Sequence, residues 1–188
     1  MMDRILNAIV RTGLKWGYPL ARIGWQLTHP SVHGAHVVLR IRSDSSHEDE
    51  ILVVRHSYKP GLSVPCGGSH RKESALDGAL RELFEEVGIR LDPEQLSAKG
   101  EIFLIQDGRK DHGHFFECVL PQEARPRVQI DEREIIWADF LPESELRGLD
   151  LLPHLSRYLD QPCPVPTDAE QRSLGRQPKV AATVGQGP

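Results

Sequence analysis

The chain has 188 residues, of which 27% are charged and 39% hydrophobic, and its formal net charge is −4. This composition suits one domain with extensions and a sizeable core, and the charge balance argues against large-scale nucleic-acid binding. No apolar run has the length needed to span a bilayer. Cys66, Cys118 and Cys163 form neither a metal-type pair nor an even disulfide framework, so we expect a reducing, cytoplasmic location.

Residues 1–28 mix apolar side chains with the basic residues Arg4, Arg11, Lys15 and Arg22. We expect an amphipathic helical segment here, divided into two short helices at Gly17 and Pro19. It is predicted to pack on the domain or on a second subunit. The alternative is that its basic, aromatic-flanked pattern lies on an anionic membrane surface.

Residues 29–160 read as the main domain. Stretches rich in Val, Ile and Leu predict strands at 33–41, 51–56, 100–106, 114–120 and 135–140, with a hairpin turn at Asp107-Gly108. One helix is expected within 74–87, and two more after Pro142 and over 151–159. This order predicts an α/β sandwich with mixed strand direction. The Pro- and Gly-rich residues 161–188 are predicted to be disordered.

The central helix carries Glu82, Glu85 and Glu86 at offsets of three and four residues, which places the carboxylates on neighbouring positions of one face. Like charges this close repel, so we expect the helix to hold cations there. Oxygen ligands suit Mg²⁺ or Mn²⁺ rather than zinc. The opposite stripe, formed by Leu76, Leu80, Leu83 and Val87, is predicted to be buried while the acidic face is exposed.

The ends of this helix are also marked in the sequence. Ser74 and Asp77 have the spacing of a capping box, and Gly88 stands where a left-handed terminator belongs. Before the helix, Gly67 and Gly68 follow Pro65-Cys66 in a tight turn that lets the backbone approach a ligand. A carbonyl of this turn can complete the shell of a hard ion.

The stretch from Gly67 to Ile89 resembles the Nudix box, the motif of the Nudix hydrolase family. The fixed positions filled at the right spacing are Gly67, Glu73, Arg81-Glu82-Leu83, Glu85-Glu86 and Gly88-Ile89. The resemblance implies an α/β/α sandwich with a mixed sheet and Mg²⁺ held by Glu82, Glu85, Glu86 and the Gly67 carbonyl. It also implies an ion pair between Glu73 and Arg81 that braces the loop. Cys66 and Lys72 depart from the glycines common at their positions.

Outside the motif, family members often add an acid from a late loop before an aromatic-bearing strand. Glu134 is the residue we expect to act as a further ligand or general base, with Asp131 and Glu132 as rivals and a plain surface glutamate as the alternative. Arg55, Lys59, Arg71 and Lys72 are candidates to meet substrate phosphates, or else solvated side chains. His112 and His114 share one strand face but lack further zinc ligands in the sequence, and Cys66 is read as a small loop residue with a potential for oxidation.

The resemblance implies a Mg²⁺-dependent pyrophosphohydrolase that cleaves the diphosphate of a nucleoside diphosphate derivative or a nucleoside triphosphate. Two alternatives stay open: a catalytically weak nucleotide-binding regulatory module, and a membrane-surface hydrolase of a lipid-linked diphosphate. Residues 103–106 lack the proline and the tyrosine that accompany ADP-ribose and dinucleoside polyphosphate hydrolysis in this family. The sequence therefore does not single out one nucleotide derivative.

Overall fold

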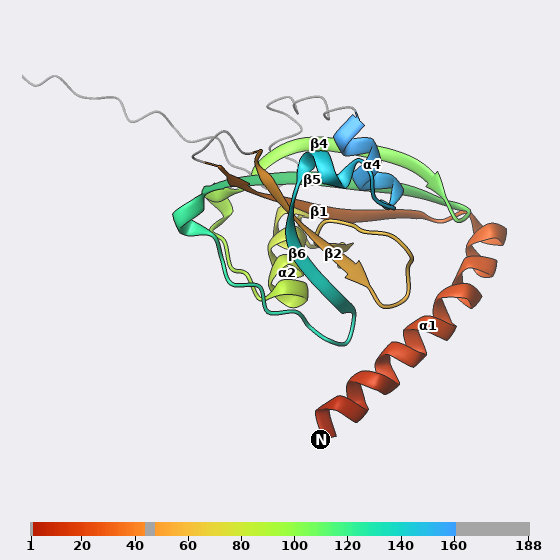
Figure 1. Ribbon diagram of the computed structural model, residues 1–188. Helices are drawn as coiled ribbons and strands as arrows, with labels where there is room; N and C mark the ends of the chain where they lie inside the picture. The colour runs from red at the N-terminus through yellow and green to blue at the C-terminus, as the bar shows by residue number, and fades with distance from the viewer. Residues whose placement is uncertain (1, 44–47, 161–188) are drawn as a thin grey trace, which may run out of the picture.

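The computed structural model describes residues 2–43 and 48–160; the tail predicted to be disordered lies outside them. The order along the chain alternates strands with short helices (Figure 1). The elements are α1 (Met2–Thr28), β1 (Ser31–Arg42), β2 (Glu50–His56), β3 (Cys66–Gly68), α2 (Ala75–Val87), η1 (Pro93–Gln95), β4 (Ser97–Gln106), β5 (Arg109–Pro121), η2 (Gln122–Ala124), β6 (Ile135–Pro142), α3 (Glu143–Leu146) and α4 (Pro153–Asp160). The predicted strands and the central helix are thereby confirmed.

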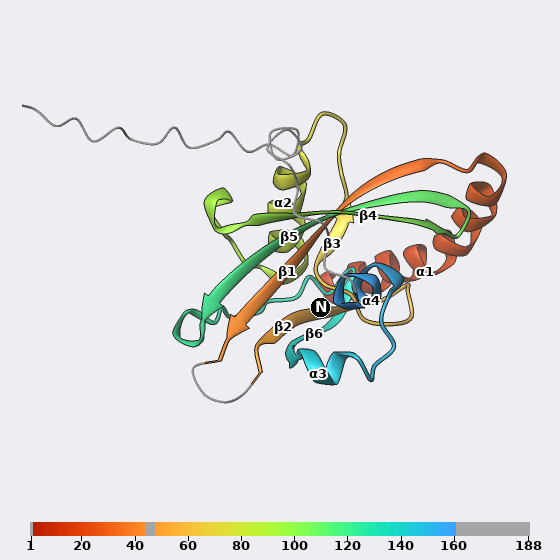
Figure 2. The same ribbon diagram turned by 90° about the horizontal axis from the view of Figure 1, so that it is seen from above.

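The described strands form one mixed six-stranded sheet in the order β4-β5-β1-β2-β6, with β3 paired to β1. β1 runs parallel to β5 along its whole length, from Ser31 beside Lys110 to Arg42 beside Pro121. Its other edge is shared: β3 pairs antiparallel near the beginning of β1 and β2 pairs antiparallel near its end. The divergence of β2 from β1 leaves the edge of β1 open for the Cys66–Gly68 segment (Figure 2).

Two apolar layers hold the sheet between helices. α2 covers one face, where Ala35, Val37, Leu39 and Ile41 of β1 pack with its buried stripe. Val38, which points the opposite way, packs with residues of α3 and α4 on the other face. The predicted α/β/α sandwich is confirmed, and the layer beneath α2 fixes the helix that carries the acidic residues.

The local signals at the ends of α2 act as expected. The Ser74 hydroxyl accepts a hydrogen bond of 3.1 Å from the Asp77 backbone N–H, and its own proton is donated to the Asp77 carboxylate. Gly88 ends the helix with a φ of 71°, and its N–H bonds to the Phe84 carbonyl. A left-handed residue at this position favours glycine because it has no Cβ.

Replacing Ser74 with alanine is expected to lower the free energy of unfolding by about 0.5–2 kcal/mol, because the Asp77 N–H would lose its cap. The change is measured by urea unfolding. Ser74→Asp serves as the control, since aspartate also caps helices and should retain most of the stability. Equal stability of the alanine variant and the wild type would contradict this role.

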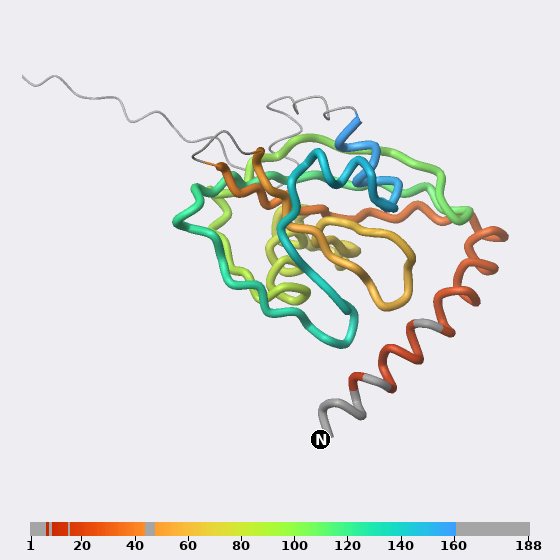
Figure 3. The backbone as a smooth tube through the Cα atoms, in the orientation of Figure 1, coloured from red at the N-terminus to blue at the C-terminus, as the bar shows by residue number. Residues whose placement is uncertain are grey.

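Residues 2–28 form one continuous helix, so the prediction of two short helices was wrong. Pro19 removes one N–H donor, which is costly inside a helix, but the helix is held to the domain on both sides of the proline. The Tyr18 hydroxyl donates to Asp107 over 2.9 Å, and Arg22 forms an ion pair with the same carboxylate at 2.9 Å. The β4–β5 turn lies against the carboxyl-terminal part of α1 (Figure 3).

The side of α1 opposite the domain is apolar and exposed. The large exposed side chains there are Ile9, Trp16, Leu20, Ile23 and Leu27. They recur at helical spacing and form one stripe, which we call the outer stripe of α1. Within the described residues, no helix combines the length and apolar character needed to cross a membrane.

Candidate active site

A cavity of about 1070 Å³ opens between α2, β3 and the segment that precedes β6; we call it the acidic cavity. Its walls bring together the turn before α2, the acidic face of α2 and the late loop. The lining residues used below are Tyr58, Cys66, Gly67, Gly68, His70, Arg81, Glu82, Glu85, Glu86, Asp131, Arg133 and Glu134. The three predicted carboxylates of α2 therefore share one cavity with Glu134.

Glu86 corrects the expectation of an exposed acidic face. Its side chain is only 4% exposed, because the residue lies where α2 meets β2 and β3. One carboxylate oxygen lies 2.9 Å from His56 Nε2, and the other accepts the Cys66 backbone N–H at 3.0 Å. Both contacts satisfy a charge that would otherwise be costly to bury. His56, which the sequence did not single out as a partner, thus positions a central carboxylate.

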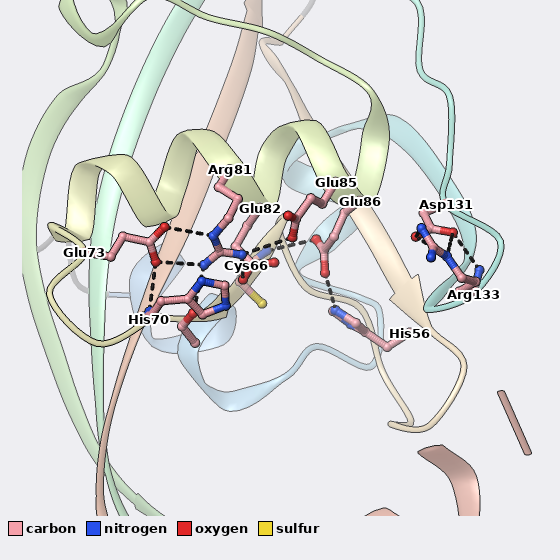
Figure 4. A network of polar contacts seen from close by, with 11 residues as sticks. His56, Cys66, His70, Glu73, Arg81, Glu82, Glu85, Glu86, Asp131 and Arg133 are labelled. Atoms are coloured by element: carbon pink, nitrogen blue, oxygen red, sulfur yellow. Dashed lines mark hydrogen bonds and ion pairs between the residues drawn. The ribbon is translucent and has the colours of Figure 1, made fainter. Parts of the chain in front are cut away.

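Arg81 is the hub of the site (Figure 4). Its guanidinium donates to both oxygens of Glu73, at 2.8 and 2.9 Å, and to the Gly68 carbonyl at 3.0 Å. The same group donates to Glu82 at 2.7 Å and to Glu85 at 3.0 Å. A planar fork of donors suits such bidentate pairing. Arg81 therefore ties the glycine turn and the start of the loop to the acidic face of α2.

The hydrogen bonds from Arg81 lower the pKa of Glu73 from 4.5 to about 2, and the His70 N–H, which donates at 2.8 Å, adds to the shift. A carboxylate whose pKa is depressed by folding stabilises the folded chain above its unfolded pKa. That contribution is lost as the pH falls from about 4.5 towards 2.

Glu73→Gln is therefore expected to be less stable than the wild type near neutral pH, with the difference narrowing as both are acidified. Unfolding free energies measured in urea from about pH 6 to about pH 3 test this, because protonated Glu73 resembles glutamine. A difference that stays constant over this range would show that the charge of Glu73 contributes nothing.

Gly67 lies directly against Glu82. A Cβ placed on Gly67 would be 2.1 Å from the nearest carboxylate oxygen of Glu82, whereas a Cβ on Gly68 would meet nothing within 4 Å. Burial raises the pKa of Glu82, and the negative charges of Glu86 and Glu85 add to the rise against the pull of Arg81. The carboxylate is thus held close to the glycine backbone in a region of excess negative charge.

The two departures from the motif have distinct structural accounts. Lys72 has a φ of 71°, a left-handed conformation that glycine adopts freely and lysine at a cost of about 1–2 kcal/mol. The backbone path of the loop is thus that of a glycine-containing turn. Burial, with the neighbouring Glu86 charge, raises the pKa of the Cys66 thiol to about 12. Because the thiolate is the reactive form, this thiol is poorly suited to nucleophilic or redox chemistry.

Of the three acids in the loop before β6, Glu134 is the one that lines the acidic cavity without an arginine paired to it. Glu134 lines the acidic cavity, and burial together with the charge of Glu86 raises its pKa. Asp131 also lines the cavity, but Arg133 donates to it at 3.0 Å. Burial acts to raise the pKa of Asp131, yet the hydrogen bonds from Arg133 outweigh it and leave the pKa lowered. Glu132 is exposed and is not part of the cavity wall.

The basic residues are distributed differently from the carboxylates. Arg55 lies over the Trp137 ring and lines a separate cavity. Arg71, which is exposed, and Lys72 do not line the acidic cavity. Lys59 lines a neighbouring cavity that shares the Gly67-Gly68 turn. The basic residues that line the acidic cavity are Arg81, Arg133 and His70. Arg133 follows the acid Asp131 closely in sequence, which is the one signal that could have pointed to it.

The donor set fits a hard divalent ion by its chemistry, since Glu82, Glu85 and Glu86 offer only oxygen atoms and stand beside a glycine turn. In residues 2–43 and 48–160, no group of three or more His, Cys, Asp or Glu side chains is arranged to hold a metal ion as it stands. Two of the carboxylates are paired with Arg81 instead. Glu85, whose side chain is 54% exposed, has the greatest freedom to exchange that pairing for an ion.

A second group of imidazoles lies on the sheet. His33 of β1 stacks on His112 and His114 of β5, with ring centroids 4.6 and 5.7 Å apart, and Glu101 lies 2.6 Å from His112 Nδ1. The structure thus adds a third imidazole to the predicted pair. His33 Nδ1 lies 3.5 Å from His114 Nε2, and among the described residues no three His, Cys, Asp or Glu side chains are arranged to hold a metal ion.

The fold and the cavity define a class: mixed α/β/α sandwiches in which a glycine turn and an acidic helix form one site. A model of the NUDIX domain matches residues 32–160, which is more than half of the chain. The chain therefore belongs to the Nudix family.

Relatives and a solved structure agree with this membership. The chain is 30% identical over 101 residues to "Nudix hydrolase 18, mitochondrial" of Arabidopsis thaliana, and this alignment covers 53% of this chain and 57% of the relative. It is 44% identical over 41 residues to "Probable DHNTP pyrophosphohydrolase" of Lactococcus lactis, and that alignment covers 22% of this chain and 25% of the relative. The match thus spans little more than half of one curated relative and a quarter of the other.

The NUDIX domain of Shewanella oneidensis NrtR, solved with ADP ribose, has the same fold. Its TM-score is 0.60 at 15% sequence identity, and the match covers 76% of this chain and 88% of that one. At this identity the likeness establishes the architecture alone.

Proposed function

We propose that the chain is a Mg²⁺-dependent pyrophosphohydrolase that cleaves the diphosphate linkage of a nucleoside diphosphate derivative or a nucleoside triphosphate. The observation that carries the proposal is the acidic cavity, in which three carboxylates of α2 face a glycine turn braced by Arg81. The names of the two curated relatives, a Nudix hydrolase and a pyrophosphohydrolase, support the same reaction class.

Glu82, Glu85 and Glu86, with the Gly67 carbonyl, would hold Mg²⁺ or Mn²⁺. When bound, such an ion neutralises phosphate charge and lowers the pKa of a coordinated water. The buried pair between His56 and Glu86 fixes one carboxylate in place. Arg81 keeps Glu82 and Glu85 on the same side of the cavity.

Glu134 is the proposed general base, with Glu82 as the alternative. A base is most effective when its pKa lies near the working pH, and burial raises the pKa of both residues. Glu134 is not paired with Arg81, so it is the freer of the two to accept a proton. Arg133 and His70, on the wall of the same cavity, would meet substrate phosphates. Lys59 would do so from the neighbouring cavity.

A phosphate-release screen over nucleotide derivatives tests this proposal, with Mg²⁺ or with a chelator in its place. We expect one group of nucleoside diphosphate derivatives or triphosphates to be hydrolysed with Mg²⁺ and none with the chelator. Nucleotide binding without turnover would instead favour the regulatory module that the sequence left open.

The outer stripe of α1 favours a second candidate, a hydrolase that works on a lipid-linked diphosphate at a membrane surface. The apolar side chains of this stripe are exposed, and they extend over several turns of α1. Residues 2–28 contain four basic residues and one acidic residue. This charge suits an anionic bilayer better than a second, equally basic copy of the helix.

Replacing Leu20 and Ile23 together with glutamine is expected to reduce co-sedimentation with anionic liposomes by at least about tenfold, because two large apolar groups would no longer enter the bilayer. Gln26→Ala is the control on the same helix. Point variants are preferable to deletion of α1, which would also open the neighbouring cavity. Equal partitioning of the wild type and the double variant would exclude this candidate.

A further inference from the structure

The loop before β6, residues 125–134, carries Glu134, and we call it the late loop. Backbone hydrogen bonds tie it to α2 and to the segment after β2. The Asp131 N–H donates to the Glu86 carbonyl over 2.9 Å, and the Ser57 N–H donates to the Glu134 carbonyl over 2.8 Å. Between these ties the chain makes a turn, in which the Glu134 N–H donates to the Asp131 carbonyl over 3.2 Å. The position of Glu134 therefore depends on how firmly this turn is held.

A side chain of α1 contacts this turn from outside. Arg11 Nε donates a hydrogen bond to the carbonyl oxygen of Glu132, which lies within the turn. Val10, the preceding residue of α1, lines the acidic cavity together with Asp131. Burial raises the pKa of Asp131, whereas the hydrogen bonds from Arg133 and, to a smaller extent, the charge of Arg11 lower it. These observations agree that the amino-terminal half of α1 lies against the late loop.

The other half of α1 is fixed to the body of the domain. Asp107 of the β4–β5 turn pairs with Arg22 at 2.9 Å. Gly108 packs closely on α1, since a Cβ there would lie 2.8 Å from the Gln26 Cα. An α-helix rises about 1.5 Å per residue, so Arg22 and Arg11 are about 16 Å apart along its axis. α1 is thus a rod that runs from the β4–β5 turn to the late loop (Figure 1).

We propose that Arg11 is a positioning residue, which braces the late loop from α1 and so keeps Glu134 at the acidic cavity. The inference rests on the proposed hydrolase function, in which Glu134 acts as the general base. Arg11 does not line the acidic cavity, and it holds a backbone oxygen two residues before the acid. The charge of a guanidinium strengthens its hydrogen bond to a carbonyl. A shift of about 1 Å in a reacting group can lower the rate about a hundredfold.

The first test measures the late loop itself and needs no substrate. Arg11→Ala removes the donor and keeps α1 helical, since alanine is the best helix former. We expect hydrogen–deuterium exchange of peptides covering residues 131–135 to become at least about threefold faster, because the turn would open at a lower cost in free energy. Arg157→Ala, which removes an exposed arginine from α4, is the control and should exchange like the wild type in these peptides. Thermal unfolding checks that both variants fold.

The second test asks whether Arg11 acts through Glu134. On a substrate found in the phosphate-release screen, Arg11→Ala should lower kcat at least about tenfold and leave KM within about twofold, because the change displaces the base and removes no contact with substrate. Glu134→Gln should lower kcat as well. In the double variant, Arg11→Ala should cause little further loss, because no carboxylate is left to misplace.

Exchange of the late loop that is equal in Arg11→Ala and the wild type overturns the proposal. A loss of kcat from Arg11→Ala that is equally large with and without Glu134 also overturns it, because Arg11 would then act on the protein as a whole.

Failure of the proposed function would look different. If the wild type hydrolyses no diphosphate while exchange of the late loop still responds to Arg11→Ala, the hydrolase is removed and the brace remains. If Glu134→Gln turns over at the wild-type rate, the hydrolase remains with another base and the role of Arg11 in the reaction is overturned.

Discussion

Replacing Glu85 with glutamine is expected to lower turnover by about 10²-fold or more while leaving stability close to that of the wild type. The loss follows from removing one anionic ligand: a bound divalent ion contributes several kcal/mol to the transition state, and about 1.4 kcal/mol is a factor of ten in rate. The retained stability follows from exposure, because the Glu85 side chain is 54% exposed and its hydrogen bond is to Arg81.

Steady-state rates with saturating Mg²⁺ and thermal unfolding of the same samples measure the two effects. Glu123→Gln is the matched control, since Glu123 is an exposed glutamate of η2 outside the acidic cavity. Glu86→Gln is a less clean variant, because Glu86 is buried between His56 and the Cys66 N–H. A Glu85→Gln protein that turned over near the wild-type rate would show that the metal assignment is wrong.

Replacing Gly67 with alanine is expected to reduce turnover by about a hundredfold, because the new methyl group would occupy the place of the Glu82 carboxylate. The two groups cannot both remain, since the Cβ would lie 2.1 Å from that oxygen. The carboxylate is the end of a flexible side chain, so the fold should survive while Glu82 moves. A misplacement of about 1 Å can cost a hundredfold in rate.

Gly68→Ala is the control, because its Cβ would meet nothing within 4 Å. We expect it to keep most of its activity although it lies one residue further along the same strand. Comparable losses in the two variants would show that the strand tolerates no side chain at all, and that the closeness of Gly67 to Glu82 is irrelevant to the rate.

Much of the domain could be predicted because its signals are local. Ser74, Gly88 and the apolar stripe through Leu83 mark the ends and the buried face of α2, and the structure places all of them accordingly. The Glu73–Arg81 pair came from the motif resemblance, and it forms with two hydrogen bonds. The helix ends, the buried face and the ion pair of α2 and its loop all depend on residues close in sequence, so the sequence could predict them.

The remaining features depend on contacts between distant segments. Glu86 is buried because α2 packs at the point where β2 and β3 diverge, and His56 reaches it from β2. Helix propensity around Pro19 indicated a break, but Tyr18 and Arg22 bind Asp107 of the β4–β5 turn and keep α1 intact. The cavity that α1 and Lys59 line forms only because α1 lies against the sheet, which no local pattern encodes.

The parallel pairing of β1 with β5 has a consequence for how the chain reaches its native state. Ser31 pairs with Lys110 and Arg42 with Pro121, so the strand at the centre of the sheet meets its longest partner only after most of the domain has left the ribosome. Pairings this remote in sequence fold slowly, because the connecting chain must lose its freedom before the contacts form. A nascent chain arrested before residue 109 should therefore remain sensitive to protease, whereas one that exposes residues up to 160 should become resistant.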